Sequence, residues 1–134
     1  MVGAFDWPIR VYFEDTDSGG VVYHSNYLKF MERGRTEWLR SLGLNQTKLR
    51  YQDNIMFVVA KLNIAYKKAA YFNDELVIKT QLKKIGASTI FLTQDILREG
   101  QLISASQVEI ACINGKLFKP QRIPKLIKQL METL

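Results

Sequence analysis

A single amphipathic helix, surrounded by segments that alternate like β-strands, constrains the fold of this chain most. Between Asn26 and about Leu42, apolar residues recur every three or four positions and so share one helical face. Ser25 or Asn26 is suited to cap the start of this helix, and Gly43 lies just past its end. The shared face consists of Tyr27, Phe30, Met31, Gly34, Trp38 and Leu42. Because glycine costs about 1 kcal/mol inside a helix, we expect another element to pack closely against Gly34.

Most other segments show the period of two that is typical of strands. The predicted strands are Ile9 to Phe13, Val58 to Tyr66, Leu76 to Lys83, Ser88 to Leu97 and Leu102 to Ile113. In the second of these, the alternation places Val58, Ala60, Leu62, Ile64 and Tyr66 on one face.

The connections between these segments are short. Pro8 stands at the start of the first strand, where proline is tolerated, and Glu99-Gly100-Gln101 forms a tight turn. Residues 45–54 form a polar segment without an assigned element, and Lys125 to Leu134 is predicted to be a short helix that begins after Pro124.

This order of elements indicates an α+β fold with one long central helix. Strands and helices do not alternate, so a doubly wound parallel sheet is excluded. One helix buries its apolar stripe only if a curved antiparallel sheet wraps around it. The 134 residues fit a single domain over residues 1–134.

Charge and cysteine content narrow the classes of function. The net charge of +6 favours an anionic partner, although a solvated basic surface explains it equally well. Cys112 is the only cysteine and lies in an apolar strand, which indicates a buried inert thiol. The stretch from Met1 to Asp6 does not read as a signal peptide, and residues 55–60, the longest purely apolar run, are too short to span a membrane. We therefore expect a cytoplasmic protein.

Residues 15–26 combine the groups that could carry chemistry. Asp17 lies on a glycine-rich turn just before the helix start, and a carboxylate there can act as general base or nucleophile. The first helical turn offers unpaired N–H groups for an anion or oxyanion. Taken alone, a sequence such as residues 15–20 more often forms an ordinary turn than a catalytic site. A calcium loop is disfavoured because Asn26 occupies its final ligand position, and His24 has no second ligand at metal spacing.

The stretch from Arg10 to Leu28 closely resembles the signature of 4-hydroxybenzoyl-CoA-thioesterase-like proteins. Within that family it is most similar to the YbgC-like branch, the bacterial acyl-CoA thioesterases associated with the Tol–Pal envelope system. The similarity continues through Glu32 to Arg40, Phe57-Val58-Val59 and Lys119-Pro120. One departure is Tyr12-Phe13, where relatives often carry Tyr-Tyr.

The resemblance implies a hotdog fold, an antiparallel sheet wrapped around the long helix, and hydrolysis of acyl-CoA without metal or organic cofactor. It makes Asp17 the catalytic carboxylate and His24 a functional histidine, with the amides around Tyr23 and His24 polarising the thioester carbonyl. The substrate would also contact Gly20, Val21 and Asn26. The basic excess would serve the coenzyme A phosphates, with Lys61, Lys84 and Lys119 as the candidates.

Partners follow from the same resemblance. It implies a homodimer or a tetramer of stacked dimers, with acyl-carrier protein or an envelope complex as further partners. Two routes stay open, in which Asp17 activates water or attacks the carbonyl itself. A dehydratase or hydratase acting on thioesters and a non-catalytic acyl-CoA or acyl-carrier-protein binder are the alternatives. A nucleic-acid module is disfavoured because the lysines are scattered along the chain.

Overall fold

The computed structural model describes residues 3–133, so the predictions that concern Met1 and Leu134 lie outside the described residues. Its strands are β1 (Phe5–Arg10), β2 (Ile55–Tyr66), β3 (Glu75–Ile85), β4 (Thr89–Arg98) and β5 (Gln101–Asn114). Its helices are α1 (His24–Ser41), α2 (Gln46–Asp53) and α3 (Lys125–Glu132), and a 3-10 turn covers Phe13–Asp15.

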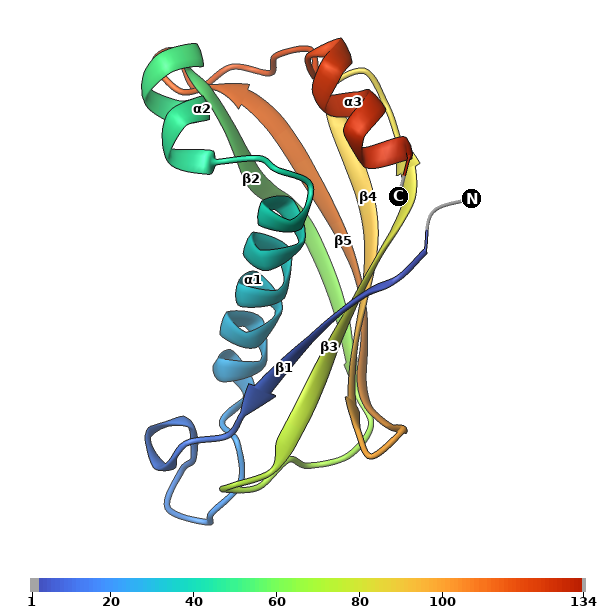
Figure 1. Cartoon of the computed structure of the whole chain (residues 1–134). Helices are drawn as coiled ribbons and strands as arrows, with labels where there is room; N and C mark the ends of the chain where they lie inside the picture. Colours follow the sequence, from blue (N-terminus) through green and yellow to red (C-terminus); the bar gives the residue numbers. More distant parts are fainter. Residues whose placement is uncertain (1–2, 134) are drawn as a thin grey trace.

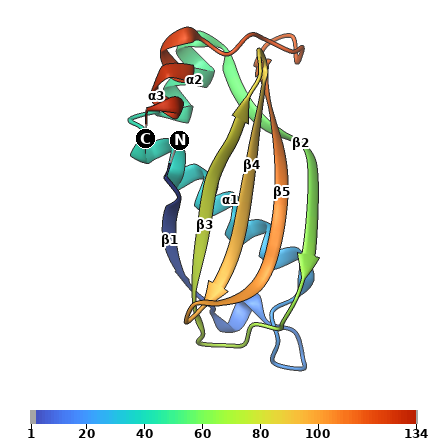
Figure 2. The same cartoon turned by 90° about the vertical axis from the view of Figure 1, so that its right-hand side faces the viewer.

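The five strands form one antiparallel sheet in the order β1-β3-β4-β5-β2. The sheet curves around α1, which lies against its concave face (Figure 1). In the view turned by 90°, α1 crosses behind the strands from one end of the sheet toward the other (Figure 2). The predicted α+β hotdog architecture is therefore confirmed.

The predicted apolar face of the helix is the face that α1 buries. Phe30 and Met31 are completely inaccessible to solvent, and Trp38 is 4% exposed. A Cβ added to Gly34 would lie 2.6 Å from Ile78 Cγ2, closer than carbon atoms can approach. The expected close approach at Gly34 is thus confirmed, and β3 is the element that makes it.

The start of α1 differs from the prediction. The helix begins at His24 after the N-cap residue Tyr23, and no side chain caps it. Asn26 does not cap because it lies inside the helix as its third residue, and its Nδ2 donates to the backbone oxygen of Asp15 over 2.8 Å. The helix end is as expected, since Gly43 follows it with a φ of 83°.

The first strand lies earlier than predicted. It covers Phe5–Arg10, because the chain turns at Phe13 into the 3-10 helix. Pro8 is therefore inside the strand and faces Val77 of β3. Its missing N–H is tolerated because β1 is an edge strand and, in the described part of the chain, has β3 as its one neighbour.

The inward face of β2 changes partway along the strand. Cross-strand partners share a face, and Phe57 and Val59 oppose the buried Cys112 and Ile110 of β5. The register then shifts between Val59 and Lys61, which leaves Ala60 without a partner as a β-bulge. The prediction that Val58 and Ala60 share one face with Leu62, Ile64 and Tyr66 was therefore wrong, because the bulge moves the alternation by one residue.

The helix α2 was missed in the polar segment 45–54. It buries none of its residues, so the sequence carries no apolar stripe there. Asn45 caps it by accepting a hydrogen bond from Lys48 N at 3.1 Å. The turn at Glu99 and Gly100 and the start of α3 after Pro124 are confirmed. Within residues 3–133, no helix has the length and apolar character needed to cross a membrane.

Candidate active site

Asp17 stands at the tip of a tight turn between Thr16 and Val22, which pair as an isolated bridge. Its N–H donates to Val21 O (2.9 Å), and its Oδ1 accepts from Gly19 N (2.8 Å). Gly20 has a φ of 80°, a conformation that glycine adopts without steric cost. The side chain is exposed, and Oδ2 has no hydrogen-bond partner among the described residues. This oxygen is free to accept a proton.

The second carboxylate of the motif, Asp15, has a structural role. It is buried, with 7% of its surface exposed, and its Oδ2 accepts from Tyr12 N at 2.8 Å. Its backbone oxygen accepts from Tyr23 N (3.1 Å) and from the side-chain amide of Asn26 (2.8 Å). These bonds hold the turn against the start of α1, so Asn26 acts here as an anchor for the loop.

The unpaired N–H groups at the N-terminus of α1 begin at His24, one residue later than predicted. The Tyr23 amide, which we expected to polarise a carbonyl, is already bonded to Asp15 O. The amides of His24 and Ser25 have no acceptor in the described part of the chain. The first turn of α1 also contains no acidic residue, so its partial positive charge is not neutralised locally. This end of α1 can therefore stabilise negative charge that develops on a nearby oxygen.

His24 packs against the end of the edge strand β2. Its ring lies 4.7 Å from the ring of Tyr66, whose hydroxyl donates to His24 O over 3.3 Å. Tyr27 stands behind them, 5.3 Å from Tyr66, and its hydroxyl accepts from Ala70 N at 3.0 Å. Burial raises the pKa of Tyr27, so its phenol stays protonated at neutral pH. Tyr66 was missed as a site residue, because nothing in its sequence neighbourhood relates it to residue 24.

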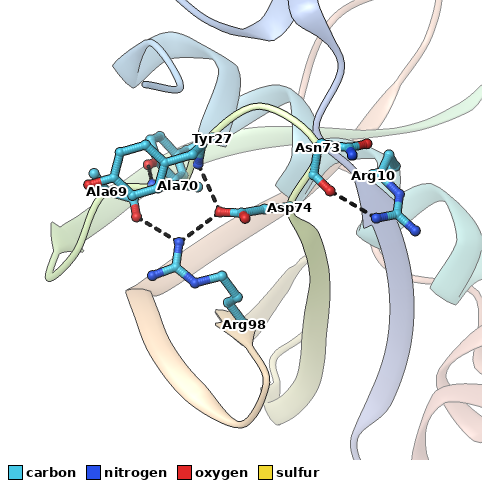
Figure 3. Close-up of polar contacts among 8 residues, drawn as sticks. Arg10, Tyr27, Ala69, Ala70, Asn73, Asp74 and Arg98 are labelled. Atoms are coloured by element: carbon cyan, nitrogen blue, oxygen red, sulfur yellow. Dashed lines mark hydrogen bonds and ion pairs between the residues drawn. The ribbon is translucent and has the colours of Figure 1, made fainter. Parts of the chain in front are cut away.

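The third wall of the site is the segment 69–74, which follows β2 (Figure 3). Val22 N donates to Ala70 O (2.8 Å), and Val21 pairs with Tyr71. Arg98 at the end of β4 holds this segment from the other side.

Two hydrogen bonds from Arg98 make this clamp. Its guanidinium donates to Asp74 Oδ2 (2.7 Å) and to Ala69 O (3.0 Å), and Asp74 Oδ2 also accepts from Tyr71 N (2.9 Å). Figure 3 shows this cluster beside the more open pair of Arg10 and Asn73. The sequence carries no signal for the clamp, since Asp74 and Arg98 belong to different elements.

The three lysines predicted to bind coenzyme A phosphates do not gather around Asp17 within one chain. Lys61 lies midway along β2, and Lys84 lies near the end of β3 with its Nζ 5.7 Å from the centre of the Phe91 ring. Lys119 belongs to the segment between β5 and α3, and this segment lies at the opposite end of the sheet from the turn that precedes α1 (Figure 1). The basic residues that follow β2 at the Asp17 end are Lys67 and Lys68, both exposed.

No group of three His, Cys, Asp or Glu side chains that could hold a metal ion occurs among residues 3–133. The groups available for chemistry are thus an exposed carboxylate, free amides at a helix start and an aromatic wall. This combination suits addition to a carbonyl carbon, in which a base or nucleophile acts while an oxyanion forms.

Comparison with known proteins gives a consistent result. The model of the thioesterase superfamily matches residues 19–105. An acyl-CoA thioesterase, YbgC, of Haemophilus influenzae is 42% identical over 124 residues, which cover 92% of this chain and 91% of that protein. An acyl-CoA thioester hydrolase, also YbgC, of Escherichia coli is 40% identical, with 92% of each chain covered.

Solved structures show the same architecture. A probable thioesterase from Bartonella henselae superposes with a TM-score of 0.87 at 39% identity, covering 91% of this chain and all of that one. The similarity therefore extends over nearly the whole chain and includes the turn of Asp17, the start of α1 and the strands that flank them.

Proposed function

Because the chain belongs to the thioesterase superfamily, we infer that it is an acyl-CoA thioesterase that hydrolyses acyl-CoA to a free acid and coenzyme A. We propose that Asp17 is its catalytic carboxylate. The observation that carries this proposal is the position of Asp17 on a glycine turn, where its Oδ2 has no hydrogen-bond partner among the described residues. Backbone hydrogen bonds hold this turn against the N-terminus of α1. The neighbouring Asp15 is buried and already bonded, which leaves Asp17 as the available group.

The chemistry follows from these groups. In one route Asp17 accepts a proton from water, and the resulting hydroxide adds to the thioester carbon. In the other, Asp17 Oδ2 adds to that carbon, and water later hydrolyses the mixed anhydride. In both, charge on the carbonyl oxygen is stabilised by the free amides at the start of α1, the C–S bond breaks, and the thiolate of coenzyme A leaves and is protonated. His24, exposed beside these amides, is placed to orient the thioester.

Asp17→Asn tests the assignment. It keeps the shape of the side chain and removes the base, so turnover should fall by at least about a hundredfold while the protein stays folded. Thiol release from an acyl-CoA panel is the measurement, and it also separates an enzyme from a mere acyl-CoA binder. Glu14→Gln is the matched control, since Glu14 is an exposed carboxylate in the same loop. Equal losses in the two variants, or turnover within a few fold of wild type, would remove Asp17 from the mechanism.

We also propose that two chains pair through β2. This strand has twelve residues and contains no proline, and within residues 3–133 it pairs with β5 alone, so its other side has no partner there. Val59 and Tyr66 on it are 44% and 42% exposed. The other edge strand, β1, has six residues and contains Pro8, which cannot donate to a further strand. An edge as long and apolar as β2 is a template for pairing, and a two-fold axis would close it.

Pairing through β2 would change which residues surround each Asp17. In an antiparallel pair centred on the middle of β2, Tyr66 of one chain lies beside Ile55–Phe57 of the other. Each Asp17 would then face strands of the partner subunit. This geometry supports a role for Lys61, Lys84 and Lys119 in holding coenzyme A phosphates from across the interface, together with Lys67 and Lys68. The cytoplasm is the location we propose, in keeping with the single free thiol of Cys112.

A further inference from the structure

The positive charge of the chain is concentrated in one segment. Residues 110–131 contain five basic side chains and no acidic one, so this segment accounts for five of the six net positive charges. Four of the five are exposed and Lys128 is half-buried, and none forms an ion pair among residues 3–133. The charge is therefore open to an anionic partner from outside the chain. The five are Lys116, Lys119, Arg122, Lys125 and Lys128.

The same segment carries an apolar tip. The turn that follows β5 exposes Leu117 and Phe118, with 66% and 67% of their surfaces accessible. Lys116 and Lys119 flank these two residues in the sequence, and we call residues 116–119 the basic tip. The segment between β5 and α3 lies at the end of the sheet that also carries α2, and the turn that precedes α1 lies at the other end (Figures 1 and 2). Apolar and positively charged side chains thus share one end of the molecule.

Hydrogen bonds from Asn114 fix the backbone of the basic tip. Its side-chain Oδ1 accepts from Lys116 N (2.9 Å) and Leu117 N (3.0 Å). Its backbone oxygen accepts from Phe118 N (2.8 Å), and its N–H donates to Lys119 O (2.8 Å). Every residue of the basic tip is therefore bonded to Asn114. Because the backbone is held in this way, the two apolar side chains project from the turn instead of folding back onto the sheet.

Phe118 has an unfavourable backbone conformation at this turn. Its φ is 52°, in the left-handed region that glycine adopts freely and that costs energy for a residue with a side chain. Glycine would suit the turn better, and the exposed ring contributes little to packing within the described chain. A strained and exposed aromatic residue of this kind indicates a contact with something outside the chain.

A lipid surface fits this combination better than another anionic partner does. A projecting turn with one aliphatic and one aromatic side chain can enter the boundary between lipid headgroups and acyl chains, whereas a folded protein would need a matching hollow to receive it. The lysines beside it can reach the phosphates of anionic lipids while their hydrocarbon stems stay near the apolar layer. No helix within residues 3–133 could cross a membrane, so the contact would be peripheral.

We propose that the basic tip docks this protein reversibly on membranes that expose anionic phospholipids. Leu117 and Phe118 enter the headgroup region, and the basic side chains between residues 116 and 128 face the lipid phosphates. Apolar insertion and charge attraction act together, because either one alone gives only weak membrane binding. The docking is separate from thioester hydrolysis, since neither Leu117 nor Phe118 takes part in the proposed chemistry.

Sedimentation of the full chain with lipid vesicles tests this inference. We expect an affinity at least about tenfold higher for vesicles of phosphatidylglycerol and phosphatidylcholine in equal parts than for phosphatidylcholine alone, and added salt should reduce the difference. Leu117→Ser combined with Phe118→Ser keeps the charge and should lower the affinity at least about fivefold. Lys116→Glu combined with Lys125→Glu keeps the apolar side chains and should lower it at least about tenfold.

Two matched controls lie at the opposite end of the molecule (Figure 1). Phe72→Ser removes a phenylalanine that is 52% exposed, and Lys67→Glu with Lys68→Glu makes the same change in net charge. Both should bind the anionic vesicles within a few fold of the wild type, because charge attraction fades beyond about 10 Å. Phe118→Gly suits the positive φ and replaces the two serine changes if they prevent folding.

Three outcomes would overturn the inference. One is vesicle binding that survives the loss of both Leu117 and Phe118, since charge alone would then explain it. Another is a loss of binding that the controls share, which would point to net charge and not to the basic tip. The third is tight binding of a DNA duplex without binding of vesicles, which would assign the surface to a different anion.

Discussion

Single residues of similar type serve different purposes in this molecule, according to how water and hydrogen-bond donors reach them. Asp15 is buried and its carboxylate accepts a bond from the backbone of Tyr12, whereas Asp17, two positions later, is exposed with one oxygen free. Arg98 is neutralised by Asp74, whereas Arg35 has only a neutral amide as its partner. Chemistry is therefore expected at Asp17, whereas Asp15 and Arg98 hold the backbone in place.

Cys112 shows how burial controls reactivity. Its side chain is inaccessible, and burial raises the pKa of its thiol from 9.0 to about 11. Between these values the unfolded chain loses the thiol proton while the folded chain keeps it, so stability falls as pH rises.

Cys112→Ala should therefore flatten the alkaline decline in stability. The wild type should lose on the order of 2 kcal/mol more unfolding free energy than Cys112→Ala between about pH 8 and about pH 11. Urea unfolding at the two pH values measures it, and the titrations of tyrosine and lysine are common to both proteins. Parallel pH curves for the two proteins would show that the thiol ionises equally in both states.

At the scale of elements, the segment 69–74 lies between β2 and β3 and makes backbone contacts with the Asp17 turn. It contacts that turn through Val22 and Val21, and it is held in place by Arg98 and Asp74, whose side chains are 22% and 24% exposed. Arg98 is therefore a positioning residue that acts on Asp17 through the backbone. Arg10, which pairs with Glu75 at 48% and 61% exposure, adjoins the same segment but is open to water.

Arg98→Met should loosen this segment. We expect a loss of about 1–3 kcal/mol in unfolding free energy, because Asp74 and Ala69 O lose a partly buried charged donor. The amide of Val22 should exchange with solvent faster, and kcat should fall more than KM rises. Arg10→Met, the control, should cost less than about 1 kcal/mol and leave Val22 protected. Similar exchange at Val22 in both variants would refute the positioning role.

At the scale of the whole molecule, each active site is proposed to lie where Asp17 of one chain faces strands of the partner subunit. Two chains that pair through β2 would hold two such sites, related by a two-fold axis.

The same assembly can be followed by dilution. Sedimentation should show no stable monomer at micromolar concentration, and specific activity should fall in step with any dissociation. Activity that persists in a monomer would contradict the shared site.

Much of the fold is visible in the sequence because its signals are periodic. The stripe from Tyr27 to Leu42 predicts which face of α1 is buried, and the alternation in residues 76–82 predicts the buried face of β3. The tight turn at Glu99 and Gly100 is also visible in the sequence, because glycine is typical of turns. In the structure both residues have the positive φ of such a turn. Local patterns suffice where each residue depends on neighbours within one element.

The departures from these patterns are long-range in origin. The bulge at Ala60 is set by how β2 aligns with β5, and α2 has no apolar face to reveal it. Among the predicted site residues, Asp17, His24, Gly20 and Val21 come together because they are close in the chain. Lys61, Lys84 and Lys119 do not, because Lys61 lies on β2, Lys84 on β3 and Lys119 in the segment between β5 and α3.

The sequence by itself determined the single long helix, the antiparallel strands and the location of Asp17 before the helix start, because each of these is written in residues close together in the chain. Only the tertiary structure decided which carboxylate is free, which amide is already bonded, and that Arg98 supports the Asp17 turn. It also placed Arg35 of α1 and Phe57 of β2 at one cavity and bonded Arg35 to Gln94 of β4. The physical reason is that hydrogen bonds and burial depend on distance in space, and residues 35, 57 and 94 become neighbours only when the sheet closes around the helix.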